Sequence, residues 1–189
     1  MGWISKRSLH FDKVLIMKSC FFAGSFDPIT NGHINLIDRA LCIFDRVVIA
    51  VGNNADKKGY FSELEKIALI HETLNESNLT TCNEQIEVVS YQSQFLFQAA
   101  FDHKCEYILR GIRDAKDFEY EAKLASFNSE NNPLIETVFL MPSQVIANVS
   151  SSFVKSLIGY EDWQLVVGKY VSRSVLEKIE EKYNATRNS

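Results

Sequence analysis

The stretch FFAGSFDPITNGH, residues 21–33, decides how the fold begins. It belongs to an apolar run over residues 20–26, which predicts a buried strand that stops at a Gly-Ser pair. A turn built on Asp27-Pro28 then leads to His33, where apolar residues at helical spacing predict an amphipathic helix. The first N–H groups of a helix are unpaired and carry partial positive charge, so a histidine there faces a natural phosphate site. The alternative is that His33 only caps or packs.

Strands and helices alternate along the rest of the chain. Apolar and β-branched runs predict further strands over residues 46–52, 86–91, 106–111 and 137–141. Helical spacing predicts helices over residues 33–44, 62–74, 94–103, 117–130, 150–157 and 172–183. This order predicts an α/β fold: a Rossmann-like, doubly wound, parallel five-stranded sheet with helices on both faces. Ligands of such sheets bind beyond the carboxyl ends of the strands, where the strand order switches.

Length and composition narrow the classes of protein further. The chain has 189 residues and a net charge of −4, which favours one soluble domain and gives no basic surface for nucleic acid. Its four cysteines are scattered, which is typical of reduced thiols in the cytoplasm and gives no metal site of Cys or His ligands. We find no signal peptide and no membrane span. Met17 stands just before the first strand, so residues 1–16 are interpreted as an N-terminal extension or a misassigned start.

Three more strand exits carry groups that suit anions. Lys57 and Lys58 follow the second strand, where two lysines would usually form only a solvated charge run. Arg110 and Arg113 flank the end of the fourth strand, and bidentate phosphate binding is favoured there over a structural ion pair. The serines at 150–152 begin a helix, either as a plain cap or as phosphate donors. Together these exits predict a site for a polyphosphate.

The kind of chemistry is limited by what the sequence lacks. There is no Walker-type phosphate loop and no Gly-x-Gly-x-x-Gly fingerprint, so neither a common NTPase nor a dehydrogenase is indicated. No nucleophile elbow and no activated cysteine is present. The available cations and hydrogen-bond donors suit a reaction in which phosphate charge is held and no covalent enzyme intermediate forms.

Several separated segments agree, in order, with one known family. These are GSFDPITNGH, DKKGYFSELEK, ILRGIRDAKDFEYE, and ETVFLMPS followed by SSSFVK. With them the chain resembles the bacterial phosphopantetheine adenylyltransferases, from about Cys20 to the C-terminal helix. They are a family of the nucleotidyltransferase superfamily, whose Gly-His signature also occurs in class I aminoacyl-tRNA synthetases. Residues 17–189 are accordingly expected to form a single nucleotidyltransferase domain.

The resemblance implies a reaction and its setting. AMP would be transferred from ATP to 4′-phosphopantetheine, giving dephospho-coenzyme A and pyrophosphate in the penultimate step of coenzyme A synthesis. Mg²⁺ would accompany ATP, with no metal ligand from the protein among the residues carried over. The enzyme would be a cytoplasmic homohexamer, a dimer of trimers, without nucleic-acid or membrane partners.

The resemblance also implies roles for particular residues. His33 would be the catalytic residue, which contacts the ATP phosphates and stabilises the charge-rich transition state. The acceptor substrate would be bound by Ser25, Lys57, Leu96 and Arg110. ATP would be bound by Ser25, Phe26, His33, Gly111, Ile112, Arg113, Glu121, Ile146, Ala147, Asn148, Val149, Ser150, Ser151 and Ser152.

This chain departs from the family pattern at three places. Phe22-Ala23 stands where the family often has Tyr-Pro, and Gly59 replaces a common proline after the two lysines. The text before the three serines is IANV, residues 146–149, where the family often has Trp-Ser-Phe-Ile. An aromatic face offers more stacking area to adenine than Ile or Asn does, so an altered affinity for ATP is predicted.

Three other readings stay open at this point. A different nucleotidyltransferase, acting on nicotinate mononucleotide or a cytidine nucleotide, would share the fold but differ at the acceptor side. A tRNA synthetase fragment would need a Lys-Met-Ser-Lys-Ser-like loop, which the sequence lacks. An inactive nucleotide-binding or regulatory protein would need none of the catalytic groups, whereas this chain retains His33, Lys57 and Arg110.

Overall fold

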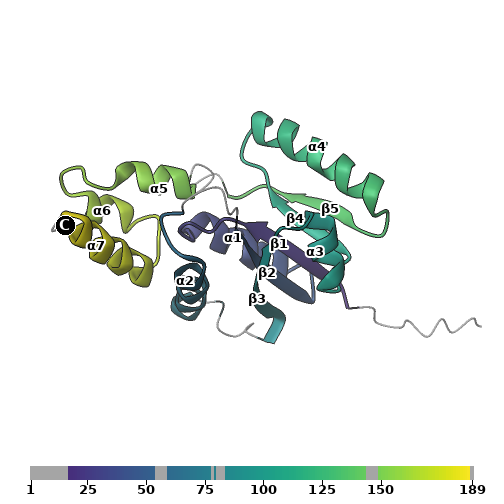
Figure 1. The fold of residues 1–189 in the computed structure, drawn as a ribbon, viewed down its shortest axis with the longest axis horizontal. Helices are drawn as coiled ribbons and strands as arrows, with labels where there is room; N and C mark the ends of the chain where they lie inside the picture. The colour runs from purple at the N-terminus through teal and green to yellow at the C-terminus, as the bar shows by residue number, and fades with distance from the viewer. Residues whose placement is uncertain (1–16, 54–58, 78, 80–83, 144–148, 188–189) are drawn as a thin grey trace, which may run out of the picture.

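A computed structural model describes residues 17–53, 59–77, 79, 84–143 and 149–187 (Figure 1). Its strands are β1 (Ser19–Gly24), β2 (Arg46–Asn53), β3 (Ile86–Gln92), β4 (Tyr107–Gly111) and β5 (Glu136–Leu140). Its helices are α1 (Asn31–Leu41), α2 (Glu63–Glu76), α3 (Leu96–Asp102), α4 (Ala115–Asn131), α5 (Ser151–Leu157), α6 (Trp163–Val167) and α7 (Arg173–Arg187). The five predicted strands and six predicted helices are all found.

The five strands form one parallel sheet in the order β3-β2-β1-β4-β5. Chain order runs outward from β1 to β3 on one side and from β4 to β5 on the other, so the strand order switches between β1 and β4. In the central register, Phe22 of β1 lies between Ile49 of β2 and Leu109 of β4. This confirms the predicted fold and places the ligand crevice at the ends of β1 and β4.

Side chains of the central strands alternate between two cores, as the pleat of a strand requires. Cys20 and Phe22 of β1 face one cluster, which also contains buried residues of α1, α2 and the C-terminal helices. Phe21 and Ala23 face the other cluster, which contains Ala99 and Ala100 of α3. Helices therefore cover both faces, and the middle of the central strands β1 and β2 is apolar because both of its faces are buried.

The C-terminal segment after β5 folds back over α2. In Figure 1, α5, α6 and α7 lie together at one end of the molecule, beside α2. Val175 and Ile179 of α7 are fully buried in the same core as Ile70 of α2. Helix α6 was not predicted from the sequence; its five residues bury only Trp163 and Val167, too few to give a periodic pattern.

Two predicted boundaries moved for local reasons. β1 ends at Gly24, because the next residues turn and Phe26 takes a positive φ of 44°. α1 begins at Asn31, two residues before His33, which becomes the third residue of the helix. Residues 1–16 lie outside the described residues, so the interpretation of that segment stays a prediction. Within the described ranges, no helix is long and apolar enough to cross a membrane.

Candidate active site

A cavity of about 430 Å³ opens at the carboxyl ends of β1 and β4, where the strand order switches. It is built from the β1–α1 turn, the end of β4, the first turns of α4 and the start of α5. The lining residues are Phe22, Ala23, Gly24, Ser25, Gly32, His33, Leu36, Arg110, Gly111, Arg113, Asp117, Glu121, Pro142, Val149, Ser150, Ser151 and Ser152. Three of the four predicted strand exits thus meet in one cavity.

His33 has one ring nitrogen fixed and the other free to act. The backbone N–H of Thr30 donates to Nδ1 of His33 at 3.0 Å, and Oγ1 of Thr30 lies 2.9 Å from the same nitrogen. A backbone N–H can only donate, so Nδ1 accepts and the neutral ring carries its proton on Nε2. In the described part of the chain no hydrogen bond engages Nε2. His33 can therefore offer an N–H donor to an anion in the cavity.

The environment of His33 keeps its ring neutral. Burial, and after it the charge of Arg113, lowers the pKa of His33 from 6.5 to about 4. The ring also packs on Phe26, with centroids 5.0 Å apart. At neutral pH this histidine is consequently a hydrogen-bond donor of fixed orientation. It is not a general acid that carries a positive charge.

Both arginines of the β4 exit are paired with carboxylates of α4. Arg110 binds Glu121 in a bidentate fashion, with Nε–Oε2 at 2.6 Å and Nη2–Oε1 at 2.5 Å, and its Nη1 donates to the Ala23 carbonyl at 2.8 Å. Arg113 binds Asp117 in the same way, with Nε–Oδ2 at 2.7 Å and Nη2–Oδ1 at 3.0 Å. These pairs fix both guanidinium planes at the cavity wall.

The pairs also limit what each arginine still offers. Among the described residues nothing hydrogen-bonds Nη1 of Arg113, so this group keeps a donor face that lines the cavity. Arg110 has fewer open donors, because all three of its nitrogens already donate. The hydrogen bond from Arg113 lowers the pKa of Asp117, which therefore stays ionised at neutral pH.

Gly111 brings β4 and α1 close together at the floor of the cavity. A Cβ at this position would lie 2.5 Å from Cδ1 of Leu36, a distance that real side chains do not reach. Glycine lets the strand end lie against the Leu36 side chain without displacing it. The close approach sets the width of the crevice between the His33 helix and the Arg113 turn.

The serines at the start of α5 are partly used within the protein. Ser150 caps the helix by accepting from the Phe153 N–H at 3.1 Å. Ser151 donates from Oγ to the Pro28 carbonyl at 2.7 Å, which ties α5 to the β1–α1 turn. Ser152 and Ser25 are exposed and line the cavity. The hydroxyl groups of the latter two are placed to meet a ligand.

Not every predicted site residue reaches the cavity with its side chain. Phe26 and Ile112 are buried, at 1% and 6% exposure, and lie outside the lining. Leu96 packs with the core on the α3 face of the sheet. Lys57 and the run Ile146, Ala147 and Asn148 lie outside the described residues. The binding roles predicted for all of these residues stay predictions.

Asp117 is a lining residue that sequence reasoning did not select. A usable signal was present, because Asp117 lies four residues after Arg113, the spacing of ion pairs on a helix. Because Asp117 is paired with Arg113, its carboxylate is less available to bind a metal ion. In the described ranges, no group of three or more His, Cys, Asp or Glu side chains could hold a metal ion.

Known proteins resemble this chain along most of its length. A family model described as cytidylyltransferase-like matches residues 21–157. The phosphopantetheine adenylyltransferase of Chromobacterium violaceum is 40% identical over 168 residues, which is 89% of this chain and 99% of that protein. The protein of the same name from Neisseria meningitidis serogroup C is 38% identical over 158 residues, or 84% of this chain and 89% of that one.

Solved structures share the fold at lower identity. Plasmodium falciparum nicotinic acid mononucleotide adenylyltransferase, complexed with NaAD, has a TM-score of 0.64 at 16% identity, over 89% of this chain and 97% of that chain. A putative nicotinate-nucleotide adenylyltransferase from Vibrio parahaemolyticus has a TM-score of 0.60 at 17% identity, over 87% and 99%. These likenesses concern the fold alone. The sequence relatives confirm the resemblance first seen in the motifs, and with 40% identity over 89% of its length, this chain belongs to the phosphopantetheine adenylyltransferase family.

Proposed function

We propose that this chain transfers AMP from ATP to 4′-phosphopantetheine and releases pyrophosphate. The product is dephospho-coenzyme A, and the reaction is the penultimate step of coenzyme A synthesis. The observation that carries the proposal is the cavity at the β1–β4 switch point, where a neutral His33 and the free face of Arg113 meet. The choice of acceptor is supported by relatives named phosphopantetheine adenylyltransferase.

The reaction requires little general-base catalysis by the protein. The nucleophile is the phosphate of the acceptor, which is already anionic at neutral pH, so catalysis relies on positioning and charge stabilisation. His33 donates from Nε2 to a non-bridging phosphate oxygen and stabilises charge that develops as the acceptor attacks the α-phosphorus. Arg113 acts on the phosphates from the opposite wall. The remaining ATP and acceptor contacts predicted from the family are part of this proposal.

Magnesium is proposed as the cofactor that enters with ATP. When bound with ATP, it would neutralise part of the phosphate charge. Asp117 and Glu121 are the carboxylates of the cavity, and both are held by arginines. The donor set therefore fits an ion carried by the triphosphate and water, as Mg²⁺ prefers, and does not provide a cage of protein ligands.

An acceptor series tests the proposed function. Pyrophosphate release from Mg-ATP is measured for the full chain with 4′-phosphopantetheine, with nicotinate mononucleotide, and with no acceptor. We expect release only with 4′-phosphopantetheine. Release with nicotinate mononucleotide instead would move the chain to the rival nucleotidyltransferase reading, and no release with any acceptor would favour the inactive nucleotide-binding protein.

The homohexamer and the cytoplasmic location are proposed from the family. Light scattering on the purified chain should give six times the 21.6 kDa mass of one chain. A mass of one chain at working concentration would contradict the assembly.

The altered ATP affinity predicted from residues 146–149 is tested by the Michaelis constant for ATP, which should change when Ile146 is replaced by Trp.

A further inference from the structure

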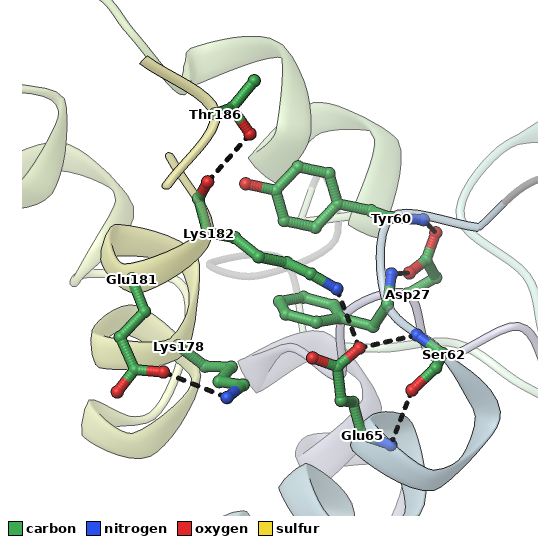
Figure 2. Close-up of polar contacts among 9 residues, drawn as sticks. Asp27, Tyr60, Ser62, Glu65, Lys178, Glu181, Lys182 and Thr186 are labelled. Carbon is green, nitrogen blue, oxygen red and sulfur yellow. Dashed lines mark hydrogen bonds and ion pairs between the residues drawn. The ribbon is translucent and has the colours of Figure 1, made fainter. Parts of the chain in front are cut away.

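Asp27 is a buried carboxylate outside the cavity lining that accepts three hydrogen bonds. It lies in the turn after β1 and is 5% exposed. Its Oδ1 accepts from the Phe61 N–H at 2.8 Å, and its Oδ2 accepts from the Tyr60 N–H at 2.9 Å. Nζ of Lys155 donates to Oδ2 at 2.9 Å. Figure 2 shows the carboxylate facing the backbone nitrogens that precede α2.

The three donors belong to two segments that lie far apart in the sequence. Tyr60 and Phe61 follow the Lys57 loop in the sequence, on the predicted acceptor side. Lys155 lies on α5, which starts at the three serines of the predicted ATP side. Asp27 itself follows Ser25 and Phe26. One carboxylate thus joins the β1, β2 and β5 exits of the sheet.

A second set of contacts holds the same segment from behind. Glu65 accepts from the Ser62 N–H at 2.8 Å and from Nζ of Lys182 at 2.7 Å, and that ammonium lies 4.8 Å above the Phe61 ring. Figure 2 shows Lys182 reaching from α7 across to Glu65. The segment before α2 is consequently held from two sides, by α7 and by Asp27.

The chemistry of Asp27 suits a fixed anchor and excludes a role as a base. Burial by itself would raise its pKa, but the hydrogen bonds from Lys155, Tyr60 and Phe61 outweigh burial and lower the pKa below 3.8. The carboxylate is therefore ionised at neutral pH, and donors occupy three of its about four lone-pair positions. It can hold its neighbours in place but has little capacity left for a proton or a metal.

We propose that Asp27 is a positioning residue that sets the separation of the two substrates, by locking the Tyr60–Phe61 segment to the β1 turn and to α5. This inference rests on the proposed AMP transfer. Attack on the α-phosphorus requires the acceptor oxygen within about 3–3.5 Å and in line, and a misplacement of about 1 Å can cost about 100-fold in rate. Loss of the anchor should therefore lower kcat more than it changes either Michaelis constant.

Three variants and one matched control test the anchor. Asp27→Asn turns one acceptor into a donor facing an N–H or the ammonium, and Lys155→Met removes the cation while both backbone hydrogen bonds can persist. Lys178→Met is the matched control, because Lys178 pairs with Glu181 at 3.0 Å on the surface of α7. In steady-state pyrophosphate release with Mg-ATP and 4′-phosphopantetheine, we expect kcat to fall about 100-fold in Asp27→Asn and about 10-fold in Lys155→Met. Lys178→Met should equal the wild type, and Lys155→Arg should restore most of the rate.

Amide hydrogen exchange at Tyr60 and Phe61 supplies a readout besides activity. We expect faster exchange at both amides in Asp27→Asn and an unchanged rate in Lys178→Met. Wild-type kcat in folded Asp27→Asn or, if that variant does not fold, in Lys155→Met would overturn the inference. If the wild type itself releases no pyrophosphate, the proposed function fails, and unchanged exchange in the variants would show separately that Asp27 anchors nothing.

Discussion

His33 has a pKa of about 4 in the folded chain against an ordinary 6.5, so the stability of the fold should depend on pH. Between these values the unfolded chain binds a proton at this ring and the folded chain does not. Stability is therefore fully present above about pH 6.5 and is lost as the pH falls toward 4. We expect a loss on the order of 2 kcal/mol over this window, measured by urea unfolding at a series of pH values.

The variant His33→Gln isolates that effect, because it removes the titrating ring. Its stability should decline less between pH 6.5 and 4 than that of the wild type. Glu65, whose pKa is lowered from 4.5 to about 2 chiefly by hydrogen bonds from Lys182 and from the Ser62 N–H, also loses its stabilising contribution as the pH falls below about 4.5. This loss is the same in both proteins and therefore cancels in the comparison. Equal slopes for the two proteins would assign the proton uptake to another group.

Arg110 and Glu121 form the more buried ion pair of the cavity wall. In Arg110→Met, the Glu121 carboxylate would lie at 8% exposure without its arginine partner. The loss of one partner from a buried ion pair lowers the free energy of unfolding by about 3 kcal/mol. In a chain of this length, each kcal/mol lowers the melting temperature by about 2–4 °C. Calorimetry should therefore show a fall of several degrees. Arg173→Met, which breaks the exposed pair with Glu177, is the control and should leave the melting temperature unchanged; a similar fall in both would contradict the assignment.

At the scale of elements, the contact between α1 and β4 depends on Gly111. Gly111→Ala places a methyl group 2.5 Å from Cδ1 of Leu36, so the Leu36 side chain, the helix or the strand end must shift. Overpacking of this kind costs about 1–3 kcal/mol, which denaturant unfolding can measure. The double variant Gly111→Ala with Leu36→Ala should lose less stability than the two single changes add up to. If the stability losses of the two single variants add up to that of the double variant, the two residues are not in steric conflict.

The periodic elements are those that the sequence predicts well. α2 spans Glu63–Glu76 where helical spacing predicts a helix over residues 62–74, and the apolar run of β1 packs into two separate cores. α6 was missed because five residues with two buried side chains give no period. Boundaries shifted where a turn overrode the apolar pattern, as at Phe26.

The candidate site was predictable only in part, because its location follows from topology but its pairings are long-range. The parallel sheet brings strand exits to one edge, so His33 and Arg113 could be expected near one another. The sequence around Asp27 contains no signal for its contact with Lys155, which lies 128 residues later in the chain. The ion pair between Arg110 and Glu121 likewise could not be predicted from the sequence and is known only from the structure.

At the scale of the whole molecule, stability and catalysis should be separable. Ile179 of α7 is fully buried against the α2 side of the core and does not line the cavity. Ile179→Ala should cost about 2–5 kcal/mol in the free energy of unfolding. Well below its melting temperature the variant should keep the kcat of the wild type for pyrophosphate release. A large loss of kcat in the folded variant would show that α7 packing also shapes the site.

Formation of dephospho-coenzyme A is the most direct test of the proposed AMP transfer. The full chain is incubated with Mg-ATP and 4′-phosphopantetheine, and the product is measured by mass spectrometry for the wild type and for folded His33→Ala. We expect dephospho-coenzyme A in equal amount to pyrophosphate from the wild type. Removal of a hydrogen bond that stabilises the transition state should slow the variant by about 100-fold or more. A folded wild type that makes no dephospho-coenzyme A, or a variant that makes it at the same rate, would contradict the proposal.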